Sequence, residues 1–421
     1  MIVQDAIRNP LVTPGSLRGA AVDPPSGEAL AFHRRLPGYR VTPLRPLAEV
    51  ARRLDIDQLF AKDESARFGL PSFKVLGASW AIARLLEQRF DLPLESWSSL
   101  DRLRALTSRL PGLALVAASD GNHGRAVAAV ARWLGVACRI YVPRGTAAAR
   151  IAAVQAEGAT CAVVDGEYDR AVAVAAQDGE ADASGRTLVV ADTSWPGYDT
   201  IPRWVSDGYD TLFAELDEQF GKLGSVPGLV VLPIGVGALA AAAVRHYRSP
   251  NAAAAPILLG VEPVGADSML ASVRHGGPRT LTDFRPSIMV GLNCETPSLA
   301  AWPLVAGGVD VLVAIPDDRA REAMRVLADA GVVAGETGAA ALGGLLELVG
   351  TPEAGPWREA LGLRDDTAAV VLSTEGATDP LSYREIVGRA PEGVIDPVGE
   401  GGTPPPEAPL ADPYPPEESA R

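Results

Sequence analysis

The sequence LALVAASDGNHGRAVAAVARWLGVACRIYV, residues 113–142, contains an apolar run, a polar loop, an amphipathic stretch and a second apolar run. The apolar runs at 113–118 and 139–142 are short and bounded by turn or loop residues, as buried strands are. The stretch 124–134 between them has the periodicity of a helix. A strand, a helix and a strand in this order favour a parallel sheet and therefore an α/β fold.

The same alternation of short apolar runs and amphipathic stretches continues from about residue 39 onward. It predicts a parallel sheet covered by helices on both faces. Further strands are expected at 160–164, 187–191, 229–232, 257–261, 309–315 and 368–372. Further helices are expected at 147–157, 168–176, 318–328 and 339–349.

Composition excludes several classes of protein. The net charge of −14 argues against a nucleic-acid partner, which needs a basic face. No uninterrupted apolar run approaches 18 residues, and the N-terminal residues lack the pattern of a secretory signal, so we expect neither a membrane span nor export. Three widely spaced cysteines fit reduced thiols in the cytoplasm and no metal site.

The lysines give the first indication of a catalytic function. Of the 38 basic residues, only Lys62, Lys74 and Lys222 are lysine. A guanidinium cannot act as a Schiff-base amine, so a lysine in so arginine-rich a chain is a candidate for amine chemistry. Lys62 lies in a charged cluster and Lys222 in a polar stretch, whereas Lys74 lies among apolar and small residues in GLPSFKVLGASW.

Three polar or glycine-rich segments follow predicted strands directly. They are SDGNHG at 119–124, PIGVGA at 233–238 and STEG at 373–376. Ligands of open parallel sheets collect at this edge. Ser119 and Asn122 can cap a helix whose free N–H groups favour an anion, and the glycines can close around a phosphate. The Ser373 hydroxyl could face a ring nitrogen or cap a helix.

As a set, these segments resemble the fold-type II pyridoxal-phosphate (PLP) enzymes, the tryptophan synthase β and threonine dehydratase group. Within that group the chain is most similar to the diaminopropionate ammonia-lyases. The resemblance runs from about residue 39 to residue 389. It is carried by KDESARFGLPSFKVLGAS (62–79), SDGNHGRAVA (119–128), DTSWPGYDTIPRWVSDGY (192–209) and LSTEGATDPLSYREIV (372–387).

The resemblance implies two open, twisted, mostly parallel sheets flanked by helices, with the cofactor between two domains. We expect the larger domain to comprise residues 1–84 and 205–390 and the smaller one residues 85–204. The Pro-rich tail, 391–421, is expected to be disordered. The family also implies a homodimer.

The resemblance also implies roles for individual residues. Lys74 would hold PLP and serve as the base at the substrate Cα, and His123 is expected to serve the structure of its loop. The residues expected to bind the cofactor are Lys74, Phe73, Asn122, Gly235, Val236, Gly237, Ala238 and Ser373. The residues expected to bind the substrate are Ser119, Asp120, Gly121, Asn122 and Asp192.

Asp120 and Asp192 decide the expected substrate. A carboxylate beside an anionic substrate group is costly, and a second ammonium on the substrate would compensate it. The resemblance to the lyases then implies elimination of ammonia from 2,3-diaminopropionate, giving pyruvate and ammonia, with both acids catalytic. Both could instead be turn or cap residues. The alternatives are a serine or threonine dehydratase or β-replacement enzyme, a cofactor-holding pseudoenzyme, and a non-catalytic regulator that binds a phosphate ligand.

Overall fold

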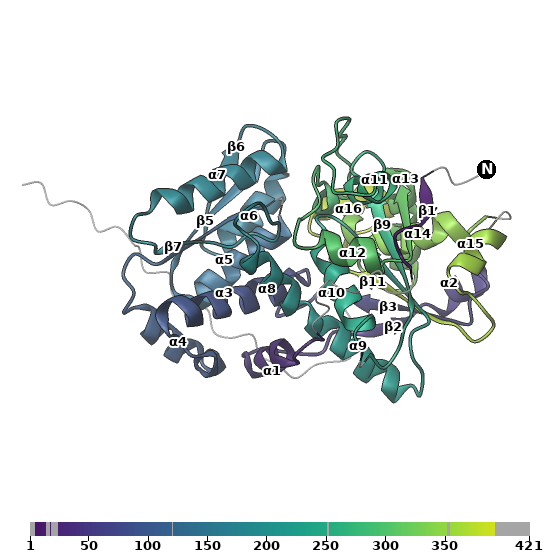
Figure 1. The fold of residues 1–421 in the computed structure, drawn as a ribbon, viewed down its shortest axis with the longest axis horizontal. Helices are drawn as coiled ribbons and strands as arrows, with labels where there is room; N and C mark the ends of the chain where they lie inside the picture. Colours follow the sequence, from purple (N-terminus) through teal and green to yellow (C-terminus); the bar gives the residue numbers. More distant parts are fainter. Residues whose placement is uncertain are drawn as a thin grey trace, which may run out of the picture.

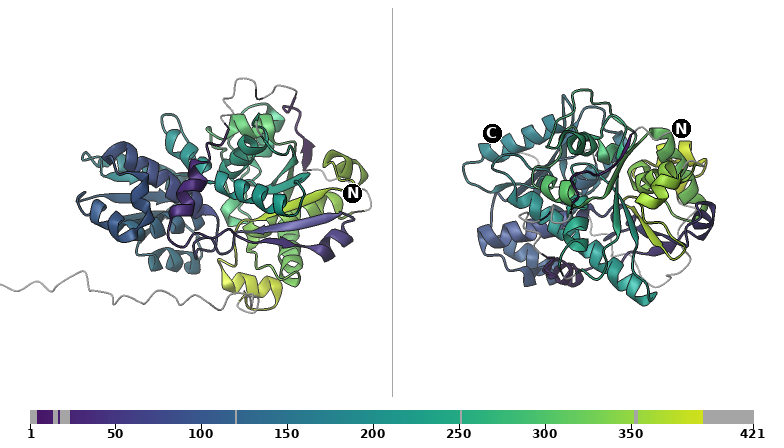
Figure 2. Two further views of the ribbon diagram at one scale, coloured as in Figure 1. Left: turned by 90° about the horizontal axis from the view of Figure 1, so that it is seen from below. Right: turned by 45° about the vertical axis from the view of Figure 1, so that its right-hand side comes forward.

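The structure is a computed structural model that describes residues 5–13, 17, 24–119, 121–250, 252–351 and 354–391. Asp120 and residues 392–421, which carry two of the expectations above, lie outside the described residues. The chain forms two lobes, each built around its own sheet (Figure 1). Figure 2 shows the same two lobes from two further directions.

The larger sheet has seven strands within the described residues, in the order β1-β10-β9-β8-β11-β3-β2. The five central strands are parallel, and the short edge strands β1 and β2 are antiparallel to their neighbours. The strands are β1 (Ala6–Arg8), β2 (Leu44–Pro46), β3 (Gln58–Asp63), β8 (Leu229–Pro233), β9 (Ile257–Pro263), β10 (Val311–Ile315) and β11 (Ala368–Ser373). Strands β8, β10 and β11 are buried along their whole length, as expected of a parallel sheet with both faces covered.

The smaller sheet has four parallel strands in the described part of the chain, in the order β6-β5-β4-β7. They are β4 (Ala114–Ala118), β5 (Ala137–Pro143), β6 (Thr160–Val164) and β7 (Thr187–Val189). This sheet lies in the lobe coloured blue and teal in Figure 1. The expected domain limits stay a prediction, and a helix that begins at Lys74 crosses the first of them.

Helices cover both sheets. The helices of the first half are α1 (Glu28–Arg35), α2 (Ala48–Arg53), α3 (Lys74–Phe90), α4 (Leu100–Thr107), α5 (Asn122–Leu134), α6 (Ala148–Ala156), α7 (Tyr168–Ala181) and α8 (Thr200–Gly208). The second half has α9 (Asp210–Lys222), α10 (Ala238–Tyr247), α11 (Ser268–His275), α12 (Trp302–Gly308), α13 (Asp317–Asp329), α14 (Glu336–Val349), α15 (Gly355–Ala360) and α16 (Pro380–Val387). Short 3₁₀ turns lie at Leu94–Ser98 and Val290–Leu292. Every helix in the described part is too short or too polar to span a bilayer.

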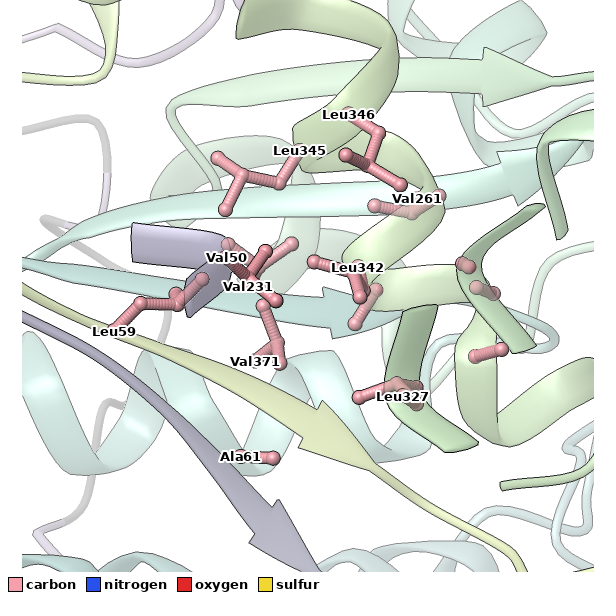
Figure 3. Close-up of a cluster of buried hydrophobic side chains, with 14 of the residues drawn as sticks. Val50, Leu59, Ala61, Val231, Val261, Leu327, Leu342, Leu345, Leu346 and Val371 are labelled. Atoms are coloured by element: carbon pink, nitrogen blue, oxygen red, sulfur yellow. The ribbon is translucent and has the colours of Figure 1, made fainter. Parts of the chain in front are cut away.

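The α/β fold is confirmed, and all eight strands and five helices predicted from the sequence form close to their expected positions. On one face of the large sheet, α13 and α14 pack their apolar side chains against those of the strands (Figure 3). Leu327, Leu342 and Leu346 meet Val231 and Val261 there, all of them buried. This core holds the carboxyl ends of the strands, from which the site is built, in fixed relative positions.

Helices α3 and α8 approach each other so closely that glycine is required at the crossing. A Cβ added to Gly208 would overlap the backbone carbonyl of Leu76, and one added to Gly77 would lie 2.6 Å from the Tyr209 ring. Because α3 begins with Lys74, this contact also helps to position the lysine.

We expect Gly208→Ala to lower the free energy of unfolding by about 1–3 kcal/mol, because backbone atoms must move to admit the methyl group. Urea unfolding followed by circular dichroism measures it. Gly221→Ala is the matched control, since Gly221 is also helical but has no atom within 4 Å of an added Cβ. Equal unfolding midpoints for the two variants would show that the crossing tolerates the extra atom.

Candidate active site

Lys74 lies at the first position of α3. The chain just before it is tied to the end of the large sheet, because the Phe73 N–H donates to the Thr374 carbonyl at 3.3 Å. The Lys74 side chain is 19% exposed, and its Nζ lies 2.7 Å from Oδ2 of Asp192. The two residues with the strongest predicted chemistry, 118 positions apart in the sequence, therefore form an ion pair.

Asp192 is the centre of a polar cluster. The Tyr168 hydroxyl donates to its Oδ1 at 2.9 Å, and Nδ1 of His123 lies 3.8 Å from its Oδ2. Burial opposes ionisation of Asp192, but His123, when it is protonated in acid, and the Lys74 ammonium hold the pKa of its carboxyl well below the usual range. Asp192 is therefore ionised at neutral pH, so the site carries a buried negative charge.

The two ring nitrogens of His123 face different neighbours: Nε2 faces the backbone of Val190, and Nδ1 faces Asp192. Its Nε2 lies 2.8 Å from the carbonyl of Val190, to which it donates. Burial is the main cause that lowers the pKa of His123, so the imidazole is neutral at pH 7. The Val190 contact agrees with the loop-holding role expected from the sequence.

The glycine-rich loop lies between β8 and α10, as predicted. Gly235, Val236, Gly237 and Ala238 all line the cavity that contains Lys74. Gly237 has φ of +100°, a conformation that side chains rarely adopt, and a Cβ at Gly235 would lie 3.0 Å from the Gly291 carbonyl. The loop thus presents backbone and the N-terminus of α10 to the cavity, an arrangement that suits a phosphate.

The loop after β4 begins with Ser119, whose Oγ accepts a hydrogen bond from the Gly121 N–H at 2.9 Å. The residue that precedes α5 is Gly121, and no side chain caps this helix, so the predicted capping role of Ser119 and Asn122 is wrong. Asn122 instead donates a short hydrogen bond from its Nδ2 to Oε2 of Glu375. The loop between β4 and α5 is thereby connected to the end of β11 in the large sheet.

Ser373 is the last residue of β11 and is fully buried. Neither its hydroxyl nor that of Thr374 has a hydrogen-bond partner among the described residues. Thr374 lines the cavity, whereas Ser373 does not. Buried hydroxyls without partners are uncommon, and a polar group of a bound molecule would satisfy the one that faces the cavity.

The structure brings most of the predicted site residues into one cavity between the two sheets. Its lining includes Phe73, Lys74, Ser119, Asn122, Asp192, Gly235, Val236, Gly237 and Ala238. Gly121 and Ser373 lie beside it but do not line it, and Asp120 falls outside the described residues.

Sequence reasoning missed three polar residues of the site. Tyr168 binds Asp192, Glu375 binds Asn122, and Thr337 lines the cavity near the start of α14. Tyr168 follows a predicted strand, so the rule that located the other loops could have found it. Glu375 lies in the STEG segment that this rule did locate, but the sequence assigned it no role. Nothing in the residues themselves separates them from ordinary packing and capping side chains.

Comparison with known proteins gives the family. The family model described as "Pyridoxal-phosphate dependent enzyme" matches residues 35–363. The diaminopropionate ammonia-lyase of Salmonella typhimurium is 34% identical over 86% of this chain and 91% of that protein, and the Escherichia coli K12 enzyme is 35% identical over 85% and 90%. The crystal structure of the E. coli enzyme with an aminoacrylate-PLP azomethine reaction intermediate superposes with a TM-score of 0.80, at 34% identity, and covers 91% of this chain and 96% of that one.

The chain belongs to the pyridoxal-phosphate-dependent enzymes, in the diaminopropionate ammonia-lyase family. The fold-type II architecture and the PLP cofactor expected from the sequence are thus confirmed. The chain is a PLP-dependent lyase by family, which argues against the alternative of a regulator without catalysis.

The cavity of this PLP enzyme fits its cofactor. Lys74 supplies an amine for a covalent bond, and the loop from Gly235 to Ala238 supplies the N-terminus of a helix for the phosphate. The Asn122 amide has a second N–H available for an oxygen of the ring. The Thr374 hydroxyl lines the cavity and has no hydrogen-bond partner among the described residues, so it could form a hydrogen bond with a polar atom of the ring.

Proposed function

We propose that the chain eliminates ammonia from 2,3-diaminopropionate and yields pyruvate and ammonia, with an amino acid as the substrate class. The observation that carries the proposal is the ion pair between Asp192 and Lys74, 2.7 Å apart in the buried cavity. A carboxylate that already holds one ammonium in this cavity suits the second ammonium of a diamine substrate.

Each residue has a role in this reaction. Bound PLP withdraws electrons from the substrate Cα and so makes its proton acidic. Lys74 removes that proton from the L-enantiomer. The ionised carboxylate of Asp192 holds the β-amino group in its protonated, ammonium form, so that it can leave as neutral ammonia. Asp120, placed by sequence next to Gly121, is proposed as the base for the D-enantiomer.

The other residues bind and orient. Asn122 would hold an oxygen of the PLP ring. Ser373 is the residue expected from the sequence at the ring nitrogen, but Thr374, whose hydroxyl lines the cavity, is the better placed of the two. Tyr168 keeps the carboxylate of Asp192 oriented, because its hydroxyl donates to Oδ1 and leaves Oδ2 toward Lys74. The buried position of Asp192 excludes water from the reacting amine and strengthens both contacts.

The test is pyruvate release from D- and L-2,3-diaminopropionate, with L-serine and L-threonine beside them, using purified holoenzyme. We expect the diamine to be turned over faster than the hydroxy amino acids by about 100-fold or more, the range of one well-placed acid–base group at the leaving group. Preferred turnover of serine or threonine would instead assign a dehydratase, and no turnover of any of them would leave the substrate to be sought among other β-substituted amino acids.

We further propose a cytoplasmic homodimer. The described residues leave apolar side chains such as Val163, Val226 and Leu381 more than half exposed, which is compatible with a second copy. Light scattering of the holoenzyme at working concentration measures the mass, and a monomer would contradict the dimer.

A further inference from the structure

Arg150 is a buried cation next to the loop between β4 and α5. It lies in the first turn of α6, and its side chain is only 5% exposed. A Cβ added to Gly121 would lie 3.2 Å from its Cδ and 3.4 Å from its Nη1. The guanidinium is therefore packed directly against the loop residue predicted to contact the substrate carboxylate.

The guanidinium of Arg150 is incompletely paired. Its Nη1 is buried and has no hydrogen-bond partner within the described residues. Its Nη2 lies 4.0 Å from Oε2 of Glu336, too far for a hydrogen bond. A buried donor without an acceptor is costly, so an anionic ligand that accepts from this guanidinium would gain more than it would on an exposed arginine.

Arg150 also lines a second cavity that adjoins the active site. Tyr168 lines both cavities, so the two meet at this side chain. The second cavity lies between the lobes, with Arg150 on the side of the small sheet and Glu336, at the start of α14, on the side of the large one. Arg150 itself lines only the second cavity, which adjoins the cavity of Lys74 at Tyr168.

The positive charges of the two cavities leave one candidate for a substrate carboxylate. The permanently charged cations that line them, among the described residues, are Lys74, Arg144 and Arg150. Lys74 is paired with Asp192, and Arg144 is exposed and paired with Asp165. An amino acid brings a carboxylate into a site that already holds a buried acid. A nearby cation would offset the repulsion between the two, and Arg150 is the buried cation without a close acidic partner among the described residues.

We propose that Arg150 is the cationic group that recognises the α-carboxylate of the amino-acid substrate beside Gly121. This inference rests on the proposed function only in taking an α-amino acid as the ligand. Charged hydrogen bonds between guanidinium and carboxylate are among the strongest in proteins, and they would fix the orientation of Cα toward Lys74.

The test compares serine with ethanolamine, which is serine without its carboxylate. Binding of either amine to the holoenzyme is followed by the change in PLP absorbance, so no turnover is needed. We expect Arg150→Gln to weaken serine binding by about 10- to 100-fold and ethanolamine binding by less than about twofold. Arg150→Lys, which keeps the charge, is expected to retain most of the affinity for serine.

Two control variants separate recognition from a structural ion pair. Arg144→Gln removes an exposed arginine on the rim of the same cavity and should leave both affinities unchanged. Glu336→Gln should leave serine binding unchanged or tighten it, whereas a purely structural pair predicts the same loss as Arg150→Gln.

Three outcomes would overturn the proposal: an equal loss for serine and ethanolamine, unchanged serine binding in Arg150→Gln and Arg150→Lys, or a wild-type enzyme that binds both amines equally. Because these titrations do not depend on elimination, they stay interpretable even if 2,3-diaminopropionate is not the substrate.

Discussion

Lys74→Ala is expected to reduce pyruvate release by about 10⁴-fold or more, the largest effect of any single substitution in this chain. The variant loses the amine that bonds PLP and the base that removes the Cα proton, and each alone contributes a factor of 10²–10⁴. Absorbance of the purified protein measures the covalent bond, and coupled assay of pyruvate measures turnover.

Two further lysine variants make this result specific. Lys74→Arg preserves the positive charge beside Asp192 but not the nucleophilic amine, so it should be as inactive as Lys74→Ala. Lys222→Ala, at the end of α9 on an exposed position, should behave as wild type. An absorbance band of lysine-bound PLP that survives in Lys74→Ala would assign the cofactor bond to another lysine.

The fold could be predicted where burial leaves a local pattern. Strands β8 and β11 are apolar throughout because helices cover both faces of the large sheet, and such runs are visible in the sequence. Strand β3 was missed because it contains Lys62 and Asp63, which are buried. Lys62 is fully enclosed and paired at 2.8 Å with Glu215, which lies 153 positions later, so its burial depends on a partner that local sequence does not reveal.

The edge strands and the helix that carries Lys74 were missed for other reasons. Strands β1 and β2 have three residues each, too few for a periodic pattern, and β2 ends on a proline, which edge positions tolerate. Helix α3 is buried nearly all round, so it lacks the polar face that marks a helix in a sequence.

The site could be predicted as a set of loops but not as a set of contacts. Parallel strands deliver their carboxyl ends to one edge, so loops after β4, β8 and β11 had to meet. The pairing of Asn122 with Glu375 joins segments 253 positions apart, and that of Tyr168 with Asp192 depends on how α7 is placed on the small sheet. Such contacts follow from tertiary packing, which a single sequence does not display.

Asp192→Asn is expected to reduce turnover of 2,3-diaminopropionate by about 10²–10⁴-fold, the second largest effect. The substitution removes the negative charge that holds the β-amino group as an ammonium in a buried cavity, so the leaving group is no longer kept protonated. Pyruvate release measures the loss. Serine has no β-ammonium and so makes no ammonium contact that the substitution could remove. Its affinity, measured by the change in PLP absorbance, should therefore change by less than about threefold.

The low pKa of Asp192 adds a pH dependence with a definite sign. Because its folded pKa lies below the unfolded value of about 3.9, the ionised carboxylate stabilises the fold above that pH, and the contribution is lost as the pH falls through the folded value. The stability difference between wild type and Asp192→Asn should therefore be constant from about pH 5 to 7 and shrink in acid.

Asp165→Asn, at an exposed ion pair with Arg144, is the control for the turnover experiment and should match wild type in turnover. Equal losses of diamine turnover and serine binding in Asp192→Asn would assign the carboxylate to the architecture of the site, with no special role toward the second ammonium.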